Sequence, residues 1–198
     1  MALMTTGILW LLPRAHALIA GPEVFEASQY DGSAYTLDLA DARLTLVNAN
    51  LPLADTTAPS LAVADDATGV QLDAEAAQSY RTMAAAARQQ GVTLTLEEGY
   101  QDTADEYATG YGADILSADS TEKTAAFAKS RAYQWLTAYA AEYGFVERWP
   151  EDRQAATGMA YAPWHWRYVG KENALALRAS GLSLEEFLAL GQLSGTND

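Results

Sequence analysis

The sequence predicts an α+β fold, in which helices pack on a small β-sheet. Residues 73–90 consist almost entirely of helix-forming residues, Asp73 can cap the first turn, and Gly91 suits the position after the last turn. Residues 92–96 alternate apolar residues with threonine, which indicates a strand directly after this helix. Further helical and strand-like stretches follow toward the C-terminus, so we expect both kinds of element in one domain.

Shorter elements precede and follow this pair. Residues 42–47 alternate enough to predict a strand, and the Asn and Pro residues of 48–52 predict a turn after it. Residues 172–179 and 183–190 predict two helices near the C-terminus. The second of these opens with Ser183-Leu-Glu-Glu186, which has the form of a capping box.

A second long helix is expected over residues 121–143. It would stop at Gly144, and Asp119 and Glu122 could form its N-terminal cap pair. We find no internal repeat, linker or low-complexity segment in the sequence.

Composition bounds the class of protein. A chain of 198 residues with 49% hydrophobic and 10% aromatic residues can form one globular domain with a substantial core. The net charge of -14 argues against binding to nucleic acid or to anionic lipid surfaces, and a solvated acidic surface explains most of it. The absence of cysteine excludes disulfides and thiolate metal sites.

The N-terminal residues 1–40 are expected to extend a domain that covers residues 41–198. The apolar run over residues 7–12 is too short to span a bilayer, so we expect no membrane span. The segment lacks the positive start of a signal peptide, although residues 15–17 resemble a small-x-small cleavage site. A shortened secretion signal and an ordinary first strand or packing arm both remain open.

The most informative stretch is residues 161–170, which read Tyr-Ala-Pro-Trp-His-Trp-Arg-Tyr-Val-Gly. Aromatic and apolar residues at strand-like density surround His165, and packing that fixes an imidazole ring suits a metal ligand. A plain core histidine among aromatic residues is the alternative interpretation. In residues 105–115, Asp114 follows Gly110 and Gly112, and it could equally be a turn or strand-end residue.

These two stretches resemble the zinc D-alanyl-D-alanine carboxypeptidases of the VanY type. Residues 161–170 are similar to that family's Glu-Pro-Trp-His-x-Arg-Tyr-Val-Gly segment, and residues 105–115 align with its Ser-x-His-x-x-Gly-x-Ala-x-Asp pattern. Shorter matches lie at residues 44–52, 98–101 and 143–150, in family order over residues 44–188. The resemblance implies a small, mainly antiparallel sheet with packed helices.

The resemblance also implies a site, and this sequence departs from it. The family's metal-ligand positions correspond to Tyr107, Asp114 and His165, and its general-base position is Ala162, whose methyl group cannot accept a proton. Tyrosine ligates a metal only as phenolate, and its ordinary pKa of about 10 disfavours that form. We therefore expect Asp114 and His165 to be remnant ligands and no cofactor to bind. Zinc is the alternative, and His16 is the other histidine that could be recruited to it.

The substrate side of the site has changed as well. Gln101 stands where the family has an arginine that holds the substrate carboxylate, and a neutral amide cannot form that bidentate pair. Only residues 102–104 separate Gln101 from Asp105, so a segment that would wall one side of the cleft is expected to be missing. The candidate substrate contacts are Tyr100, Gln101, Tyr107, Tyr111, Trp164, Trp166 and Arg167.

The sequence is therefore interpreted as a catalytically inactive, VanY-like protein that binds a peptide or a peptidoglycan stem fragment. One alternative is an active zinc D,D- or L,D-carboxypeptidase that uses Tyr107, Asp114 and His165 with a carboxylate base elsewhere. Another is a structural or regulatory partner of an active relative, with the N-terminal extension as the interface. The resemblance implies an extracytoplasmic or cell-envelope location.

Overall fold

The computed structural model describes residues 37–54 and 57–194, and its core is a four-stranded antiparallel sheet. The apolar run, the possible cleavage site and His16 lie outside the described residues. The strands are β1 (Leu61–Val63), β2 (Gln71–Asp73), β3 (Leu94–Glu98), β4 (Gly112–Ser117), β5 (Phe145–Glu147) and β6 (His165–Tyr168). The order in the main sheet is β3-β4-β6-β5, and β1 and β2 form a separate antiparallel pair.

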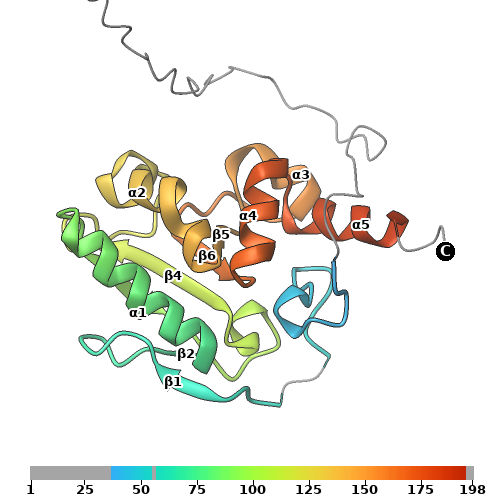
Figure 1. Cartoon of the computed structure of the whole chain (residues 1–198), viewed down its shortest axis with the longest axis horizontal. Coiled ribbons are helices and arrows are strands. Elements are labelled where there is room, and N and C mark those ends of the chain that lie inside the picture. Colours follow the sequence, from blue (N-terminus) through green and yellow to red (C-terminus); the bar gives the residue numbers. More distant parts are fainter. Residues whose placement is uncertain (1–36, 55–56, 195–198) are drawn as a thin grey trace, which may run out of the picture.

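Helices cover this sheet, as the α+β prediction requires. The α-helices are α1 (Ala74–Gln89), α2 (Arg131–Tyr139), α3 (Gln154–Thr157), α4 (Lys171–Ser180) and α5 (Leu184–Ser194). Single 3-10 turns connect them: η3 (Ala42–Leu44), η4 (Glu106–Thr109), η5 (Ala125–Lys129), η6 (Ala140–Tyr143) and η7 (Glu151–Arg153). Figure 1 shows α1 beside β1, β2 and β4, with α5 at the opposite side of the view. Within the described ranges, no helix is long and apolar enough to cross a bilayer.

Both helices that carry a clear cap signal form as predicted. At α1, the Asp73 carboxylate accepts a hydrogen bond from the backbone nitrogen of Glu75 at 3.0 Å, and Gly91 takes the left-handed conformation with φ of +74°. At α5, the Ser183 nitrogen donates to the Glu186 carboxylate at 2.8 Å, and the Glu186 nitrogen donates to the Ser183 hydroxyl at 3.3 Å. This reciprocal pair is the predicted capping box.

Two predicted elements are wrong, and local capping explains both. The strand predicted over residues 42–47 does not form, and its first residues are the 3-10 turn η3. The Asp41 side chain accepts a hydrogen bond from the Arg43 backbone nitrogen at 2.9 Å, which favours a turn over an extended chain. The helix over residues 121–143 is broken into η5, α2 and η6. Ser130 starts α2 by accepting from the Tyr133 nitrogen at 3.1 Å, so the break falls at a serine that can cap.

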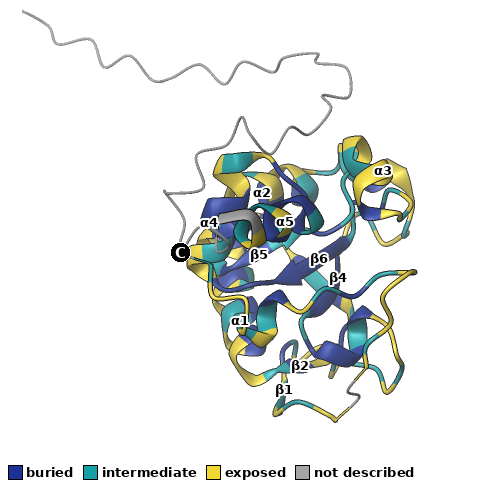
Figure 2. Ribbon diagram, turned by 90° about the vertical axis from the view of Figure 1, so that its right-hand side faces the viewer, coloured by how far each residue is buried: buried dark blue, intermediate teal, exposed yellow. Residues whose placement is uncertain are grey.

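The two faces of the main sheet serve different purposes. Ala113 and Ile115 of β4 and Trp166 and Tyr168 of β6 face α1 and α2, where they join the larger hydrophobic cluster. Because side chains alternate along a strand, Asp114, which lies between two of them, faces the other way. Figure 2 shows both central strands buried along their length, so the polar groups on that second face are also removed from water.

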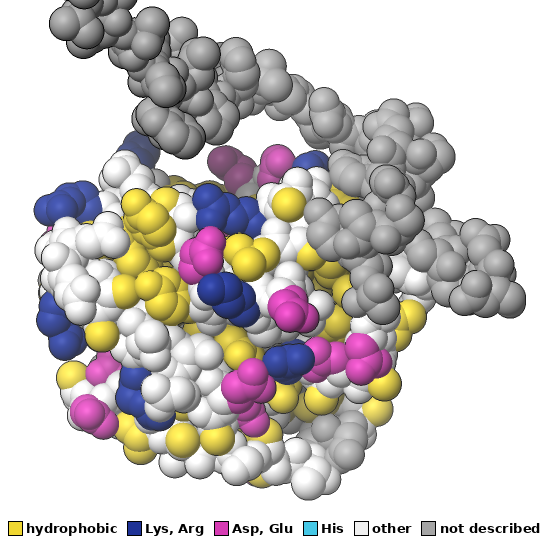
Figure 3. All heavy atoms as spheres, in the orientation of Figure 1, with side chains coloured by type: hydrophobic (Ala, Val, Ile, Leu, Met, Phe, Trp, Pro, Cys, Tyr) yellow, Lys and Arg dark blue, Asp and Glu magenta, His cyan; other side chains and the backbone are white. Residues whose placement is uncertain are grey.

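A second, smaller hydrophobic cluster packs against Val146 of the edge strand β5. Its buried members are Leu44, Ala141, Val169, Ala174, Ala176, Leu177, Leu182, Leu184, Phe187 and Leu188. They come mainly from η3, η6, α4 and α5, so the N-terminal residues of the described chain are part of the packed domain. On the face shown in Figure 3, acidic and basic side chains are interspersed, and the net charge of -14 is not gathered in one patch there.

Candidate functional site

Asp114 and His165 lie side by side because their strands pair in register. The pairing of β4 with β6 places Asp114 opposite His165, and both side chains point to the same face. The Nδ1 atom of His165 is 2.6 Å from the Asp114 Oδ1 atom. The structure therefore brings together the two residues that were predicted as remnant ligands.

Tyr107 completes this group from the single turn η4. Asp105 caps that turn by accepting from the Tyr107 nitrogen at 3.0 Å, and Gly110 ends it in the left-handed conformation with φ of +74°. The Tyr107 hydroxyl donates to Asp114 Oδ1 at 2.9 Å. Its ring meets the His165 ring edge-on, with centroids 5.2 Å apart. The third predicted position is thus in contact with the other two.

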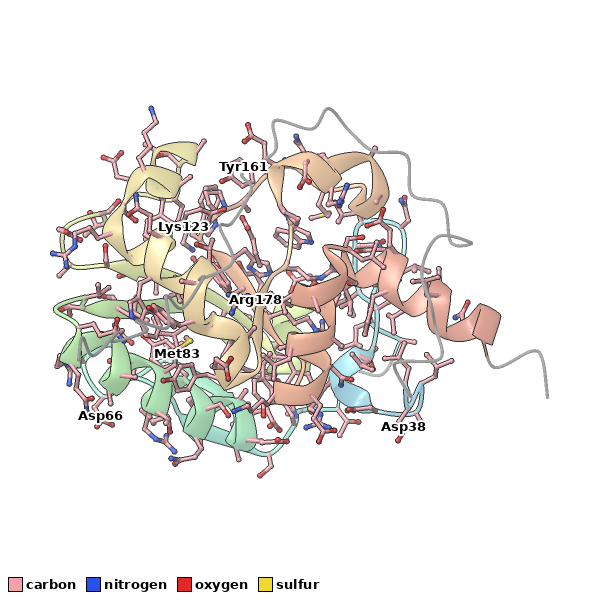
Figure 4. The ribbon with its side chains drawn as sticks, turned by 45° about the horizontal axis from the view of Figure 1, so that its top comes forward. Asp38, Asp66, Met83, Lys123, Tyr161 and Arg178 are labelled. Atoms are coloured by element: carbon pink, nitrogen blue, oxygen red, sulfur yellow. The ribbon has the colours of Figure 1, made fainter. Side chains whose placement is uncertain are left out.

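Glu98 and Lys123 extend the group on the outer side of Asp114. The β3–β4 register shifts between Leu96 and Glu98, and this bulge places Glu98 opposite Asp114. The Nζ atom of Lys123 lies 2.6 Å from Asp114 Oδ2 and 2.6 Å from Glu98 Oε1. Gln101 donates to Glu98 Oε2 at 3.2 Å. Lys123, labelled in Figure 4, reaches the site from the loop between β4 and η5.

Trp149 closes the site from the side of β5. Its ring stacks on the His165 ring with centroids 4.0 Å apart and planes 12° apart, and His165 is fully buried. The His165 Nε2 and Trp149 Nε1 atoms are buried without a hydrogen-bond partner among the described residues. Ala162, at the position of the general base, is 5% exposed, and its backbone oxygen accepts from the His165 nitrogen at 2.9 Å.

Proton positions follow from the charges around Asp114. Burial opposes ionisation of Asp114, but His165 and Lys123 lower the pKa of this carboxyl, which is therefore an acceptor only. Burial and the Asp114 charge raise the pKa of the Tyr107 phenol, so Tyr107 stays neutral and donates its proton. His165 must then carry a proton on Nδ1, and any lone pair on its Nε2 points away from Asp114.

This donor set does not fit a catalytic zinc ion. Such a site needs three protein ligands whose lone pairs converge on one point. Here Tyr107, His165 and Lys123 each direct a hydrogen at Asp114, so its oxygens already accept three hydrogen bonds. Among residues 37–54 and 57–194, no three histidine, cysteine or acidic side chains form a group that could hold a metal ion. The Nε2 atom of His165 is buried without a hydrogen-bond partner among the described residues, and Trp149 covers the face of the same ring.

A cleft opens beside this group. Its volume is about 340 Å³, and it is lined by Val47, Asn48, Ala49, Pro52, Ala104, Asp105, Glu106, Tyr107, Trp149 and Met159. Two of the lining residues, Tyr107 and Trp149, also contact His165. The cleft wall is mainly apolar, with aromatic faces next to a buried polar group, and this suits a ligand with both apolar and polar parts.

Arg167 and Trp166 do not occupy positions that suit the predicted ligand contacts. Arg167 is fully buried, and its guanidinium donates to Glu106 at 2.8 Å and to the carbonyl oxygens of Arg43 and Thr45. Trp166 is 2% exposed on the opposite face of the sheet, and its indole nitrogen donates to the Pro163 carbonyl. Both side chains already have structural partners.

The other predicted contacts are only partly buried. The guanidinium carbon of Arg167 lies over the Tyr111 ring, 5.8 Å from the ring centroid, in a cation–π contact. Trp164 packs against the larger hydrophobic cluster. Tyr100 follows β3, and its backbone nitrogen donates to the Gln71 carbonyl. Tyr107 donates to Asp114, and Gln101 donates to Glu98 beside it. The hydrogen bonds described above for this polar group do not include Tyr100, Tyr111 or Trp164.

The sequence reasoning missed Lys123, Glu98 and Trp149 as members of the site. Trp149 lies within residues 143–150, a segment that the family resemblance covers, and its tryptophan directly before a proline was a usable signal. Glu98 reaches the site through a bulge, and Lys123 reaches it from a loop with a long side chain. Neither of these two leaves a periodic pattern in the sequence.

The comparison with known families agrees with this geometry. Residues 103–171, which contain the Tyr107–Asp114–His165 group, match the VanY family, described as D-alanyl-D-alanine carboxypeptidase. Over these residues the chain is similar to the VanY family. The expectation of a VanY-type fold with a small antiparallel sheet is confirmed.

Curated relatives match parts of the chain. A D-alanyl-D-alanine carboxypeptidase of Enterococcus faecalis is 39% identical over 83 residues, which are 42% of this chain and 29% of the relative. A putative carboxypeptidase of Bacillus subtilis, YodJ, is 30% identical over 141 residues, 57% of this chain and 52% of the relative. The chain spans between 24% and 52% of the length of the curated relatives that it matches.

A solved structure extends the comparison to the fold. The vancomycin-resistance D,D-pentapeptidase VanY, as a glutamate-to-alanine variant in complex with Zn(II), superposes with a TM-score of 0.64 and 25% identity. That match covers 74% of this chain and 99% of the other. The described part of this chain therefore shares the fold of that VanY structure.

Proposed function

We propose that this VanY-like domain binds a peptide that ends in D-alanine, or a peptidoglycan stem fragment, without hydrolysing it. The observation that carries the proposal is the hydrogen bond from the Tyr107 hydroxyl to Asp114. To act as a metal ligand, Tyr107 would have to direct an oxygen lone pair at the metal, but here it directs its proton at the Asp114 carboxylate. The methyl group of Ala162 adds to it, since no proton acceptor stands at the general-base position.

The substrate class comes from the relatives. Their names include D-alanyl-D-alanine carboxypeptidase, and a related LD-carboxypeptidase, LdcB, at 25% identity and a TM-score of 0.58, is described for its peptidoglycan recognition. The cleft of about 340 Å³ beside His165 is large enough for the end of a short peptide. Trp149 and Tyr107 offer aromatic faces for its methyl groups, and Asn48 and Asp105 offer polar groups for its amides. A cell-envelope location follows from this substrate class.

Hydrolysis is tested by mass spectrometry of D-alanine released from a pentapeptide that ends in D-Ala-D-Ala, with and without added zinc. We expect no release above the level without protein. Zinc-dependent release would overturn the proposal and would favour the active carboxypeptidase, with Tyr107, Asp114 and His165 around the metal.

Binding is tested separately by tryptophan fluorescence during titration with the same peptide. Because Trp149 lines the cleft, we expect a saturable change in wild-type fluorescence that is lost in Trp149→Phe. Trp135→Phe is the matched control, since Trp135 is buried in the larger hydrophobic cluster on the other face of the sheet. A titration that changes neither the fluorescence nor the NMR signals of the wild type would remove the binding part of the proposal.

A further inference from the structure

We propose that the ammonium group of Lys123 is a built-in cation that neutralises Asp114 and excludes a divalent metal ion from this site. The inference deepens the proposed function, because it names the group that keeps the site in a form without metal. It concerns Lys123, a residue from a loop outside the aromatic and acidic motifs.

The geometry around Asp114 carries the inference. The Asp114 side chain is 2% exposed, and Lys123 Nζ lies 2.6 Å from its Oδ2 atom, while the Lys123 side chain is 30% exposed. A carboxylate removed from water in this way is strongly destabilised unless a positive charge and hydrogen bonds compensate it. Tyr107 and His165 supply hydrogen bonds to Oδ1, and Lys123 supplies the charge on the remaining oxygen.

A second carboxylate fixes the position of the ammonium. Glu98 accepts from Lys123 at 2.6 Å, and Gln101 in turn donates to Glu98 at 3.2 Å. The bulge between Leu96 and Glu98 is what aligns Glu98 with Asp114. By contrast, Lys171 is 62% exposed and its Nζ atom lies 3.4 Å from Glu142, as in an ordinary surface ion pair. The Lys123–Asp114 pair is shorter, at 2.6 Å, and its carboxylate is far less accessible to water, with a side chain 2% exposed.

Lys123 would exclude a metal ion in two ways: through its positive charge and by occupying the Oδ2 atom of Asp114. A divalent ion bound by Asp114 would stand within a few ångströms of the ammonium and would be repelled by it, and water screens this repulsion poorly at a buried carboxylate. It would also have to displace the hydrogen bond on Oδ2. Replacing Tyr107 by histidine therefore supplies a third ligand but leaves the competing cation in place.

The test measures zinc binding in a set of variants by competition with a chromophoric chelator, with zinc alone as the probe. The variants are Tyr107→His, Tyr107→His with Lys123→Met, and Tyr107→His with Lys129→Met as the control at an exposed lysine. We expect Tyr107→His to bind zinc at least 100-fold more tightly when Lys123→Met is added. Lys129→Met should change that affinity less than threefold. Equal zinc affinity with and without Lys123 would overturn the inference.

Folding is monitored by circular dichroism in every variant. If Lys123→Met does not fold in the Tyr107→His background, Lys123→Gln replaces it, because the amide still donates to Asp114 but carries no charge. The same gain in zinc affinity is expected, and its absence contradicts the inference. The inference rests on the proposed function, but the two can fail separately. The proposed function is decided by the hydrolysis and binding assays on the wild type, and the inference is decided by the zinc affinities of the variants.

Discussion

Glu106 is the residue on which the largest buried charge group depends. Its carboxylate is 3% exposed and pairs with two guanidiniums, Arg148 at 3.0 Å and Arg167 at 2.8 Å. Burial opposes its ionisation, but these two arginines lower the pKa of Glu106 below its ordinary value. Arg148 continues to Glu185 of α5 at 2.8 Å, so the group joins η4, the sheet and the C-terminal helix.

Replacing Glu106 by alanine should therefore be strongly destabilising. The substitution removes the carboxylate that compensates the charges of two buried arginines, Arg148 and Arg167. We therefore expect the free energy of unfolding to fall by about 3–5 kcal/mol. Urea denaturation of Glu106→Ala measures it, with Glu122→Ala as the control at an exposed glutamate. A loss within about 0.5 kcal/mol, the range of surface substitutions, would contradict the assigned role.

Glu147 gives a prediction about pH. Its side chain faces α2, where the Tyr133 hydroxyl donates to it at 3.0 Å, and burial raises its pKa to about 7, with the charges of Asp152 and Glu151 acting in the same direction. In the unfolded chain, Glu147 loses its proton above its ordinary pKa of about 4.3. In the folded protein it keeps that proton up to about pH 7. Stability is lost as pH rises from about 4.3 through about 7.

Glu147→Gln removes this penalty while keeping an acceptor for Tyr133. Relative to the wild type, we expect the variant to be more stable at pH 8 by on the order of 1–2 kcal/mol, since each pKa unit is about 1.4 kcal/mol and partial exposure reduces the effect. At pH 4 the difference should vanish. Urea denaturation across this pH range is the measurement, and two stability curves that run parallel from pH 4 to pH 8 would rule the effect out.

At the scale of single residues, the sequence could identify Asp114, His165 and Tyr107 because a family pattern aligns them, and strand pairing then brings two of them together. It could not assign Arg167. An arginine near an aromatic run suggests a ligand contact, but its burial depends on Glu106 and on two backbone carbonyls from η3, which are distant in the sequence.

Secondary structure elements follow the sequence at α1 and α5, where a cap residue and a periodic pattern agree. The start of α5 is an example, because Ser183 and Glu186 each satisfy the other's backbone nitrogen. The segment over residues 121–143 fails because its composition favours helix throughout, whereas Ser130 offers a competing start inside it. Helix-forming composition thus predicts that a helix exists, and capping decides where it begins.

Ser183→Ala tests the contribution of this cap to α5. Loss of the hydroxyl leaves the Glu186 nitrogen without its acceptor, and we expect the free energy of unfolding to fall by about 1 kcal/mol. Thermal unfolding followed by circular dichroism is the measurement. Ser60→Ala is the matched control, since Ser60 is exposed and lies outside the helices. Equal midpoints for the two variants would show that the capping box contributes nothing to stability.

At the scale of the whole molecule, two hydrophobic clusters share one sheet. The larger packs α1 and α2 on one face, and the smaller packs η3, η6, α4 and α5 against the edge strand β5. The buried group of Glu106, Arg148 and Arg167 lies on the second face and joins elements of both. The sequence predicted one domain over residues 41–198 but gave no sign of this partition, because the arginine contacts that link the parts span more than 40 positions.

This arrangement predicts a single cooperative unfolding transition. Phe187→Ala removes a side chain that is 2% exposed in the smaller cluster, and we expect a loss of about 3–5 kcal/mol in the free energy of unfolding. Because the shared sheet and its buried charges couple the clusters, the loss should be equally visible in the fluorescence of Trp135 and Trp166, which lie in the larger cluster. Urea denaturation followed by fluorescence and by circular dichroism should give coincident midpoints for this variant. If the fluorescence midpoint stayed at its wild-type value while the circular dichroism midpoint fell, the two clusters would unfold independently.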